Sequence, residues 1–345
     1  MISIIIPTHN RANFLKKLLA NISKLEAETD FEIIIVDNNS KDNTKEIVES
    51  FRAKNIKYVF EKSTSFTKAR DTGAKNASGD ILLYFDDDVI VQDGTLKEVT
   101  RIFKKYPSCA IASGKILPYY QQEPPNWIIE LQKSFNGFSL YDLGENLKEV
   151  HAVPGPMMAI RASVFWKIGG FPPDTIGVES NNEKKTFKKL YIGPGDYGFC
   201  LKCRLADYKI IYSPKMCVQH IIPSFRLTKE FWVSRMIGEG HCKALSIKNM
   251  IEYESEKKSK FFYLKNLIRH FIKAKLKKLK NNENILSPDE IWFEYYKALI
   301  GMQKVLDKNP KLCKYLWELG YNGVCDENFD IVLSKLPKMY KDLAL

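Results

Sequence analysis

The first 90 residues alternate short apolar runs with amphipathic stretches of about a dozen residues, and this constrains the fold more than any other feature. Four runs have the composition of buried strands: Ser3–Ile6, Phe31–Val36, Ile56–Phe60 and Ile81–Phe85. Between the first two, leucine and isoleucine recur at helical spacing from Leu15 to Leu25. Strands joined through helices make right-handed crossovers and a parallel sheet, so the sequence predicts an α/β fold.

Polar residues follow three of these runs directly, in the segments Pro7–Arg11, Asp37–Ser40 and Asp86–Asp88. In parallel sheets, ligands bind outside the carboxyl ends of the strands. We therefore expect the three segments to converge on one crevice. Ser40 is also expected to cap the helix that follows it, because serine is a preferred residue at that position.

Three consecutive aspartates, Asp86, Asp87 and Asp88, close the fourth run. Two such charges about 5 Å apart repel by roughly 3 kcal/mol at an effective dielectric constant of about 20. A divalent cation such as Mg²⁺, which takes oxygen ligands and often bridges to phosphates, would offset this repulsion. Strand alternation places Asp86 and Asp88 on one side and Asp87 on the other. This pattern assigns Asp88 to a metal, Asp86 to a nucleotide or metal, and Asp87 to a structural role. A solvated acidic turn is the alternative.

The net charge of +12 favours anionic partners, which include nucleic acid, anionic lipid and phosphorylated small molecules. The seven cysteines are odd in number and scattered, which fits a reducing compartment. The chain starts in a strand-like run without a charged leader, and no window of about 18 residues is apolar enough to span a membrane. We expect a cytoplasmic protein, either dissolved or peripheral on the inner face of the membrane.

The C-terminal third is basic and helical in pattern. The stretch Lys257–Asn281 has ten Lys or Arg residues and no acid, with Leu264, Ile268, Phe271 and Leu279 on one helix face. This is the pattern of an interfacial amphipathic helix attracted to anionic lipid, and a solvated helix face packed on the main domain is the alternative. Ser287–Glu290 reads as a capping box that starts a further helix.

Further motifs complete a pattern that runs through residues 1–240. Besides the three polar segments, it comprises Asp42, Thr44, Ala69–Arg70, Gly73–Ala74, Gly79–Asp80, Pro154–Arg161, Gly169–Phe171, Asp196, Leu201, Arg204–Leu205 and His220. In order and spacing, this pattern resembles the inverting family 2 glycosyltransferases. The resemblance implies a GT-A fold, which is a Rossmann-like mixed sheet flanked by helices. It implies a catalytic domain at 1–225, with a nucleotide-binding half at 1–110 and an acceptor half at 111–225, before a helical basic extension at 226–345.

The resemblance implies a site for a nucleotide sugar. The implied nucleotide-binding residues are Pro7, Thr8, Asn10, Arg11, Asp37, Asn39, Lys68, Arg70, Asp86 and Asp87. Asp37 can accept the imide N–H of uracil, with helix capping as the alternative. Arg70 and Lys68 would supply positive charge toward a diphosphate, or else form a solvated basic helix face. Backbone at Gly155, Pro156 and Met157 would pass beneath the donor sugar, where side chains would clash.

The implied cofactor is Mn²⁺ or Mg²⁺, held by Asp88, Asp86 and His220. Such an ion would neutralise the charge that builds on the departing nucleoside diphosphate. For His220, a role as a hydrogen-bonded core histidine stays open.

Asp196 is the expected general base, because single-displacement inversion needs a carboxylate on the face opposite the leaving group. Members of the family commonly carry an acidic pair here, whereas this chain has Gly195 before Asp196. If the missing acid were the base in relatives, Asp196 would be structural. Glu179 and Glu183 are then the alternative bases.

The sequence therefore predicts a metal-dependent inverting glycosyltransferase. It would use a nucleotide sugar, with UDP as the expected nucleotide, and a hydroxyl acceptor on a glycan or lipid-linked molecule, as in polysaccharide synthesis. Gly195 keeps open a non-catalytic module that binds nucleotide sugars. A nucleic-acid binder would explain the positive charge but not the polar segments after the strands, so we expect no nucleic-acid partner.

Overall fold

The computed structural model describes residues 1–25, 30–51, 55–63, 65–171, 175–178, 188–191, 195–248, 259–281 and 287–308. The chain forms two compact units, each discontinuous in sequence. The first unit comprises Met1–Tyr119, Phe138–Pro172 and Gly195–Ile222, and the second comprises Tyr120–Gly137, Pro173–Pro194 and Pro223–Leu345. The expected division into 1–225, with halves 1–110 and 111–225, and 226–345 stays a prediction.

A mixed sheet forms the centre of the first unit, and its described strands follow the order β3-β2-β1-β4-β8-β6-β11-β5, with β7 also paired to β11. The strands are β1 (Ile2–Thr8), β2 (Phe31–Asp37), β3 (Ile56–Phe60), β4 (Ile81–Phe85), β5 (Val89–Val91), β6 (Cys109–Tyr120), β7 (Lys148–Glu149), β8 (Met157–Arg161) and β11 (Lys209–Ile222). The first four strands are mutually parallel, as the alternating pattern predicts. Beyond β4 the sheet turns antiparallel at β8. The predicted α/β fold with a mixed sheet is confirmed.

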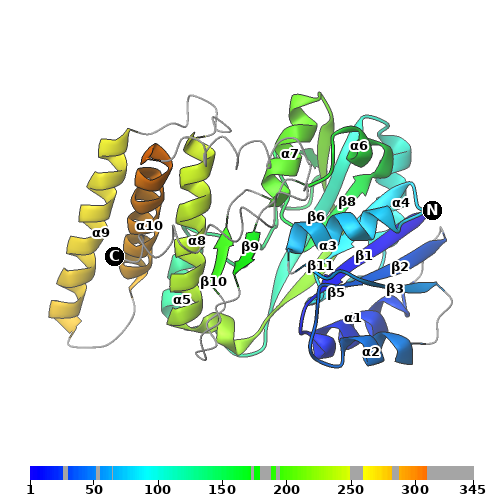
Figure 1. Ribbon diagram of the computed structural model, residues 1–345, viewed down its shortest axis with the longest axis horizontal. Coiled ribbons are helices and arrows are strands. Elements are labelled where there is room, and N and C mark those ends of the chain that lie inside the picture. The colour runs from blue at the N-terminus through cyan, green and yellow to red at the C-terminus, as the bar shows by residue number, and fades with distance from the viewer. Residues whose placement is uncertain are drawn as a thin grey trace. The chain divides into compact units, whose positions relative to one another are not determined.

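Helices cover both faces of this sheet, and Figure 1 shows α1 and α2 on one side of β1–β3 with α3 on the other. The helices of the unit are α1 (Ala12–Ile22), α2 (Thr44–Ser50), α3 (Phe66–Lys75), α4 (Thr95–Lys105), α6 (Ala162–Lys167) and α7 (Gly195–Leu205). Strand alternation divides the core accordingly. Ile4 and Ile6 of β1 join the apolar cluster that contains Leu15 and Val99, whereas Ile5 joins the cluster that contains Ala69.

The predicted cap at Ser40 is wrong. Helix α2 begins four residues later, at Thr44, with Asn43 at the capping position. Ser40 is used instead in the polar loops, where its hydroxyl accepts a hydrogen bond from the Asn10 amide at 3.0 Å. Serine favours caps and tight polar loops for the same reason, which is its short side-chain oxygen, so the sequence alone does not separate the two roles.

The second unit is mainly helical among its described residues, so the predicted C-terminal helices are confirmed. It contains α5 (Asn126–Gln132), a short hairpin of β9 (Thr175–Val178) and β10 (Lys188–Tyr191), the 3₁₀ turn η1 (Ser224–Leu227), α8 (Lys229–Lys248), α9 (Lys260–Asn281) and α10 (Pro288–Lys308). Helix α10 packs against both α8 and α9. The predicted capping box forms in part: the Ser287 amide donates to Glu290 Oε2 at 3.1 Å, but Ser287 Oγ has no hydrogen-bond partner among the described residues. Among the described helices, none combines the length and the apolarity that crossing a bilayer requires.

Candidate active site

The three polar segments meet at the carboxyl ends of neighbouring parallel strands. Thr8 at the end of β1 donates its hydroxyl proton to Asp87 Oδ2, 2.7 Å away. The loop after β1 also meets the loop after β2, because the Lys41 amide donates to Asn10 Oδ1 at 2.6 Å. These contacts join residues that are far apart in the chain. The expected convergence is therefore present in the structure.

Arg11 joins two of the three aspartates. Its Nη1 atom donates to Asp87 Oδ1 at 2.9 Å and to Asp88 Oδ2 at 2.8 Å. The expectation that Asp87 and Asp88 point to opposite sides is therefore wrong, because β4 ends at Phe85 and strand alternation no longer applies after it. Burial raises the pKa of Asp87 to about 6, even though Arg11 opposes the shift. Burial lowers the pKa of Arg11, but Asp87 and Asp88 outweigh it and raise that pKa above its ordinary value.

His220 on β11 lies against Asp88. Strand β11 pairs with β5, so that His220 is opposite Val89, the residue directly after the aspartates. The His220 Nδ1–H group donates to the Phe138 carbonyl at 2.8 Å, and Nε2 lies 3.2 Å from Asp88 Oδ1. A carbonyl oxygen only accepts hydrogen bonds, so Nδ1 carries a proton, and in the neutral ring Nε2 then carries the lone pair. His220 Nε2 and Asp88 Oδ1 would then be two acceptor atoms that face each other, an arrangement that a proton or a cation between them would stabilise.

This pair fits a divalent ion as a partial ligand set. Adjacent ligands in an octahedral Mg²⁺ site lie about 3.0 Å apart, close to the separation of His220 Nε2 and Asp88 Oδ1. The described residues hold no cluster of three metal-ligating side chains. The structure thus does not gather Asp86, Asp88 and His220 into one ligand set, because Asp86 Oδ1 is turned toward Arg70 Nη2 at 3.4 Å. The remaining ligands would be phosphate oxygens and water, as is usual for Mg²⁺ at phosphate sites.

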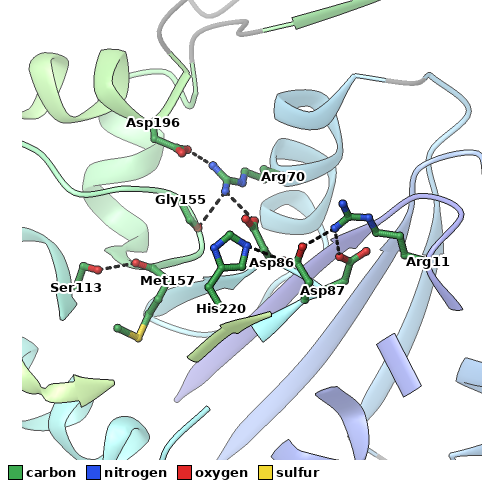
Figure 2. Close-up of polar contacts among 10 residues, drawn as sticks. Arg11, Arg70, Asp86, Asp87, Ser113, Gly155, Met157, Asp196 and His220 are labelled. Atoms are coloured by element: carbon green, nitrogen blue, oxygen red, sulfur yellow. Dashed lines mark hydrogen bonds and ion pairs between the residues drawn. The ribbon is translucent and has the colours of Figure 1, made fainter. Parts of the chain in front are cut away.

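Arg70 on α3 connects the aspartate loop to Asp196, as Figure 2 shows. Its Nη1 donates to Asp196 Oδ1, and its Nη2 donates to Asp86 Oδ1 and to the Gly155 carbonyl. The side chain is only 1% exposed. Its guanidinium lies over three aromatic rings, those of Phe66, Tyr84 and Phe171. Arg70 is therefore a buried link between two carboxylates, and its charge is shared between them.

Gly155 is required by this link. A Cβ atom at Gly155 would lie 2.2 Å from Asp196 Oδ2 and 2.6 Å from Arg70 Nη2. Real Cβ atoms do not approach other atoms so closely, so any larger residue would displace the pair. The resemblance predicted a glycine that avoids the donor sugar, and the structure adds a second reason for glycine at this position.

The two residues after Gly155 have backbone roles. The Pro156 carbonyl accepts a hydrogen bond from the Asp86 amide at 3.3 Å, which ties this segment to the aspartate loop. The Met157 side chain is fully buried in the apolar core, and its carbonyl accepts from Ser113 Oγ at 2.6 Å. Met157 thus serves the core and the sheet, and a contact from it to a donor sugar stays a prediction.

Asp37 at the end of β2 is buried and already holds two hydrogen bonds. Its Oδ1 accepts from the Ser40 amide at 2.8 Å, and its Oδ2 accepts from Tyr58 OH at 2.7 Å. Burial and the hydrogen bond to Asp37 both raise the pKa of Tyr58. Sequence reasoning missed Tyr58, because only the pairing of β2 with β3 brings it beside Asp37. The neighbouring Asn38 Oδ1 is buried and has no hydrogen-bond partner within the described part of the chain.

The other residues predicted to bind the nucleotide lie in a strand, in loops and on a partly exposed helix face. Pro7 lies within β1 and pairs with Val36 in the register of the sheet. Asn10 and Asn39 both have positive φ angles, of 54° and 61°, which asparagine tolerates better than most residues. Lys68 lies partly exposed beside Glu61, 3.9 Å away, and its expected contact with a diphosphate stays a prediction.

Asp196 lies in the first turn of α7. A carboxylate there is stabilised by the positive end of the helix dipole. Gly195, which replaces the first acid of the family pair, has a φ of +40°, a conformation that glycine adopts with little strain. The alternative bases Glu179 and Glu183 lie outside the described residues.

Comparisons with known proteins show the family and the fold to which this chain is similar. Residues 3–169 match the family model described as Glycosyl transferase family 2. The chain is 26% identical over 203 residues to a validoxylamine A glucosyltransferase of Streptomyces hygroscopicus subsp. jinggangensis, a match that covers 51% of this chain and 48% of that protein. It is 18% identical over 295 residues to a glucosyl-dolichyl phosphate glucuronosyltransferase of Haloferax volcanii, covering 84% and 90% of the two chains.

Among solved structures, the mannosyltransferase PcManGT from Pyrobaculum calidifontis, in complex with GDP-Man and Mn²⁺, superposes with a TM-score of 0.55 at 17% identity. The match covers 90% of this chain and 87% of that one, and it shows the fold alone. The chain spans about half the length of the first curated relatives that it matches, 48% in the case of the validoxylamine A glucosyltransferase.

The mixed sheet with polar loops at its parallel end is like the sheet of GT-A glycosyltransferases, and the superposition on PcManGT shows this likeness of fold. Residues 3–169 carry Arg11, Arg70 and the three aspartates, and this part of the chain is similar to glycosyltransferase family 2.

Proposed function

We propose that this protein transfers a sugar from a nucleotide donor, expected to be a UDP-sugar, to a hydroxyl acceptor with inversion at the anomeric carbon. One observation carries the proposal. Arg70 links Asp196, the candidate base, to Asp86 in the aspartate loop, so that a proton acceptor lies one side chain away from the expected diphosphate site.

The geometry of the site suggests a role for each of its other residues. The loops after β1 and β2 bind the nucleotide, where Asp37 and the unpaired Asn38 Oδ1 offer acceptors to the N–H groups of a base. Asp88 and His220 would hold the divalent ion, and that ion would offset negative charge on the diphosphate. Arg11 keeps two of the aspartates at a fixed spacing.

Asp196 would remove the proton from the acceptor hydroxyl. The acceptor oxygen then forms a bond to the anomeric carbon from the face opposite the diphosphate, and the bond from that carbon to the phosphate oxygen breaks. The electron pair of that bond leaves with the nucleoside diphosphate. Arg70 holds the carboxylate of Asp196 in place beside Gly155, where no side chain intervenes.

The acceptor would be a glycan or a lipid-linked molecule, as in polysaccharide synthesis. Two of the relatives have names that fit hydroxyl acceptors of different kinds, validoxylamine A and a glucosyl-dolichyl phosphate. A non-catalytic module that binds nucleotide sugars is the competing function, and Gly195 in place of an acid is the feature that favours it.

A donor screen with Mn²⁺ present tests the proposal. UDP- and GDP-sugars are scored first by thermal shift and then by release of the nucleoside diphosphate. We expect slow hydrolysis of one donor, abolished by EDTA and by Asp88→Ala, and lowered at least about a hundredfold in Asp196→Asn, as for loss of a general base. Tight binding of UDP without hydrolysis or transfer would instead establish the binding module. Full turnover in Asp196→Asn would assign the base to another residue.

A further inference from the structure

Helix α9 has one face packed within the second unit. Tyr263 and Ala274 are buried, and the His270 ring stacks on Tyr296 of α10 with a centroid distance of 5.6 Å. Asp289, near the start of α10, contacts two residues of α9. It accepts a hydrogen bond from His270 Nδ1 at 2.9 Å and pairs with Lys277 Nζ at 3.1 Å. Figure 1 shows α9 beside α10, and the two helices pack together. The rotation of α9 about its own axis is therefore set by this contact.

The opposite face of α9 exposes a row of large apolar side chains. They recur at the three- and four-residue spacing of one helix face: Phe261, Leu264, Ile268, Ile272 and Leu276. Their exposure runs from 46% at Leu264 to 74% at Phe261. Single exposed apolar residues need no explanation, but a contiguous row along one helix marks an interaction surface.

A row of cations borders the apolar row. Lys265, Arg269 and Lys273 follow one another at four-residue intervals and are all exposed. The stretch Lys257–Asn281 contains no acidic residue. We call the five apolar and three basic residues together the apolar-basic face.

We propose that the apolar-basic face docks on an anionic lipid bilayer, with α9 lying in the plane of the interface. An apolar row enters the boundary between headgroups and acyl chains, and a bordering cationic row meets the lipid phosphates. A helix of 22 residues, about 33 Å long, offers enough length for five apolar anchors in one row. A phosphate-bearing nucleic acid would satisfy the cations but would leave the apolar row in water. None of these eight residues belongs to the candidate active site, so the proposal does not depend on the transferase reaction.

Co-sedimentation of the full chain with vesicles tests the proposal. One set contains phosphatidylcholine alone, and the other contains phosphatidylcholine with one third phosphatidylglycerol. We expect binding to the anionic set only, and weaker binding as salt rises from 50 to 500 mM. Binding to both sets alike, or to neither, would overturn the proposal.

Variants assign the binding to the two rows. Each basic residue near a lipid surface contributes about 1 kcal/mol, or about fivefold in affinity, so Lys265→Gln/Arg269→Gln/Lys273→Gln should lose about a hundredfold. Phe261→Ser/Ile268→Ser should lose a comparable factor while keeping the salt dependence. The matched controls lie in the first unit: Lys45→Gln/Lys104→Gln/Lys105→Gln for charge, and the exposed Leu205→Ser for apolarity. Each control should bind as the parent chain does.

Two other occupants of the face give distinct outcomes. If a second copy of the chain covers it, sedimentation velocity without lipid should show a dimer that Phe261→Ser/Ile268→Ser dissociates. If residues 309–345 cover it, removal of that segment should create vesicle binding that the full chain lacks. Either result would overturn the proposal. Thermal unfolding of each variant confirms that the fold is kept.

Discussion

Arg70 and Asp196 are 126 residues apart in the chain, yet the guanidinium of one donates directly to the carboxylate of the other. Arg70 comes from the helix between the third and fourth parallel strands, whereas Asp196 comes from the first turn of α7. The contact joins the expected nucleotide site to the expected base. We therefore propose that Arg70 positions Asp196, while its expected role as a ligand for the diphosphate stays a prediction.

The variant Arg70→Lys separates these two roles. Lysine is a single charged donor and cannot bridge Asp196, Asp86 and the Gly155 carbonyl at once. We expect kcat to fall at least about tenfold, which is about 1.4 kcal/mol, while the Kd for UDP stays within about twofold. Steady-state kinetics and calorimetric titration of UDP provide the two measurements. Arg101→Lys, in an ion pair between the exposed Arg101 and the buried Glu98, is the control and should leave both unchanged. A large rise in the Kd for UDP would identify Arg70 as a diphosphate ligand.

The variant Gly155→Ala tests the tight packing around that pair. The new methyl group would displace Asp196 and Arg70, because its carbon would lie within 2.6 Å of both side chains. A misplacement of about 1 Å at a catalytic group can cost about a hundredfold in rate, and we expect a loss of that order in kcat.

Gly301→Ala is the matched control for this substitution. Gly301 lies inside α10 with open space around its Cα, so alanine there should raise the free energy of unfolding by up to about 1 kcal/mol and leave the rate unchanged. Unaltered kcat in Gly155→Ala would show that the Arg70–Asp196 contact is not needed for the reaction.

Tyr58 is expected to orient Asp37 for the base of the nucleotide. Tyr58→Phe removes the hydroxyl that donates to Asp37 Oδ2 at 2.7 Å. A hydrogen bond to a charged group contributes about 1.5 kcal/mol, so the Kd for UDP should rise roughly tenfold with little change in kcat. Calorimetry on the parent and the variant measures this shift. Tyr119→Phe, at an exposed tyrosine, serves as the control. If the variant bound UDP as tightly as the parent, Asp37 would not depend on Tyr58 for its orientation.

Asp71 should make the stability of the protein depend on pH. Burial raises the pKa of Asp71 to about 7, and the opposing effects of the Phe171 amide, Lys75, Lys202 and Arg70 are smaller. The pKa of an aspartate in the unfolded chain is about 3.9. At pH values between this pKa and the pKa of folded Asp71, the folded chain binds a proton that the unfolded chain has lost. The free energy of unfolding therefore falls as pH rises through this window and is constant above it.

The variant Asp71→Asn removes this slope. Compared with the parent, it should gain stability steadily between about pH 4 and 7, with a limiting slope of about 1.4 kcal/mol per pH unit for one proton. Urea unfolding at pH 4.5, 6 and 8 measures the difference. Asp93→Asn, at an exposed aspartate, should track the parent at every pH. A constant gap between Asp71→Asn and the parent would contradict the expectation.

Much of the fold was predictable because local sequence carries it. Buried parallel strands are continuous apolar runs, and the four runs before Asp86 became β1 to β4, with no bound shifted by more than two residues. The capping box at Ser287 is a local pattern of hydrogen bonds, and the half in which Glu290 reaches back to the Ser287 amide formed as predicted. At Ser40, by contrast, a short polar side chain had two local uses, and a loop contact with Asn10 from another strand end decided between them.

The candidate site, like the fold, was predictable from the sequence in part. The residue types at the ends of the parallel strands could be predicted from the pattern of the chain, because strand topology brings Thr8, Asp37 and Asp86–Asp88 to one edge of the sheet. Their partners became known from the folded structure: Arg11 between Asp87 and Asp88, Tyr58 on Asp37, and Arg70 on Asp196. Hydrogen bonds and ion pairs act over about 3 Å, and distances of that size between segments depend on strand register and helix packing.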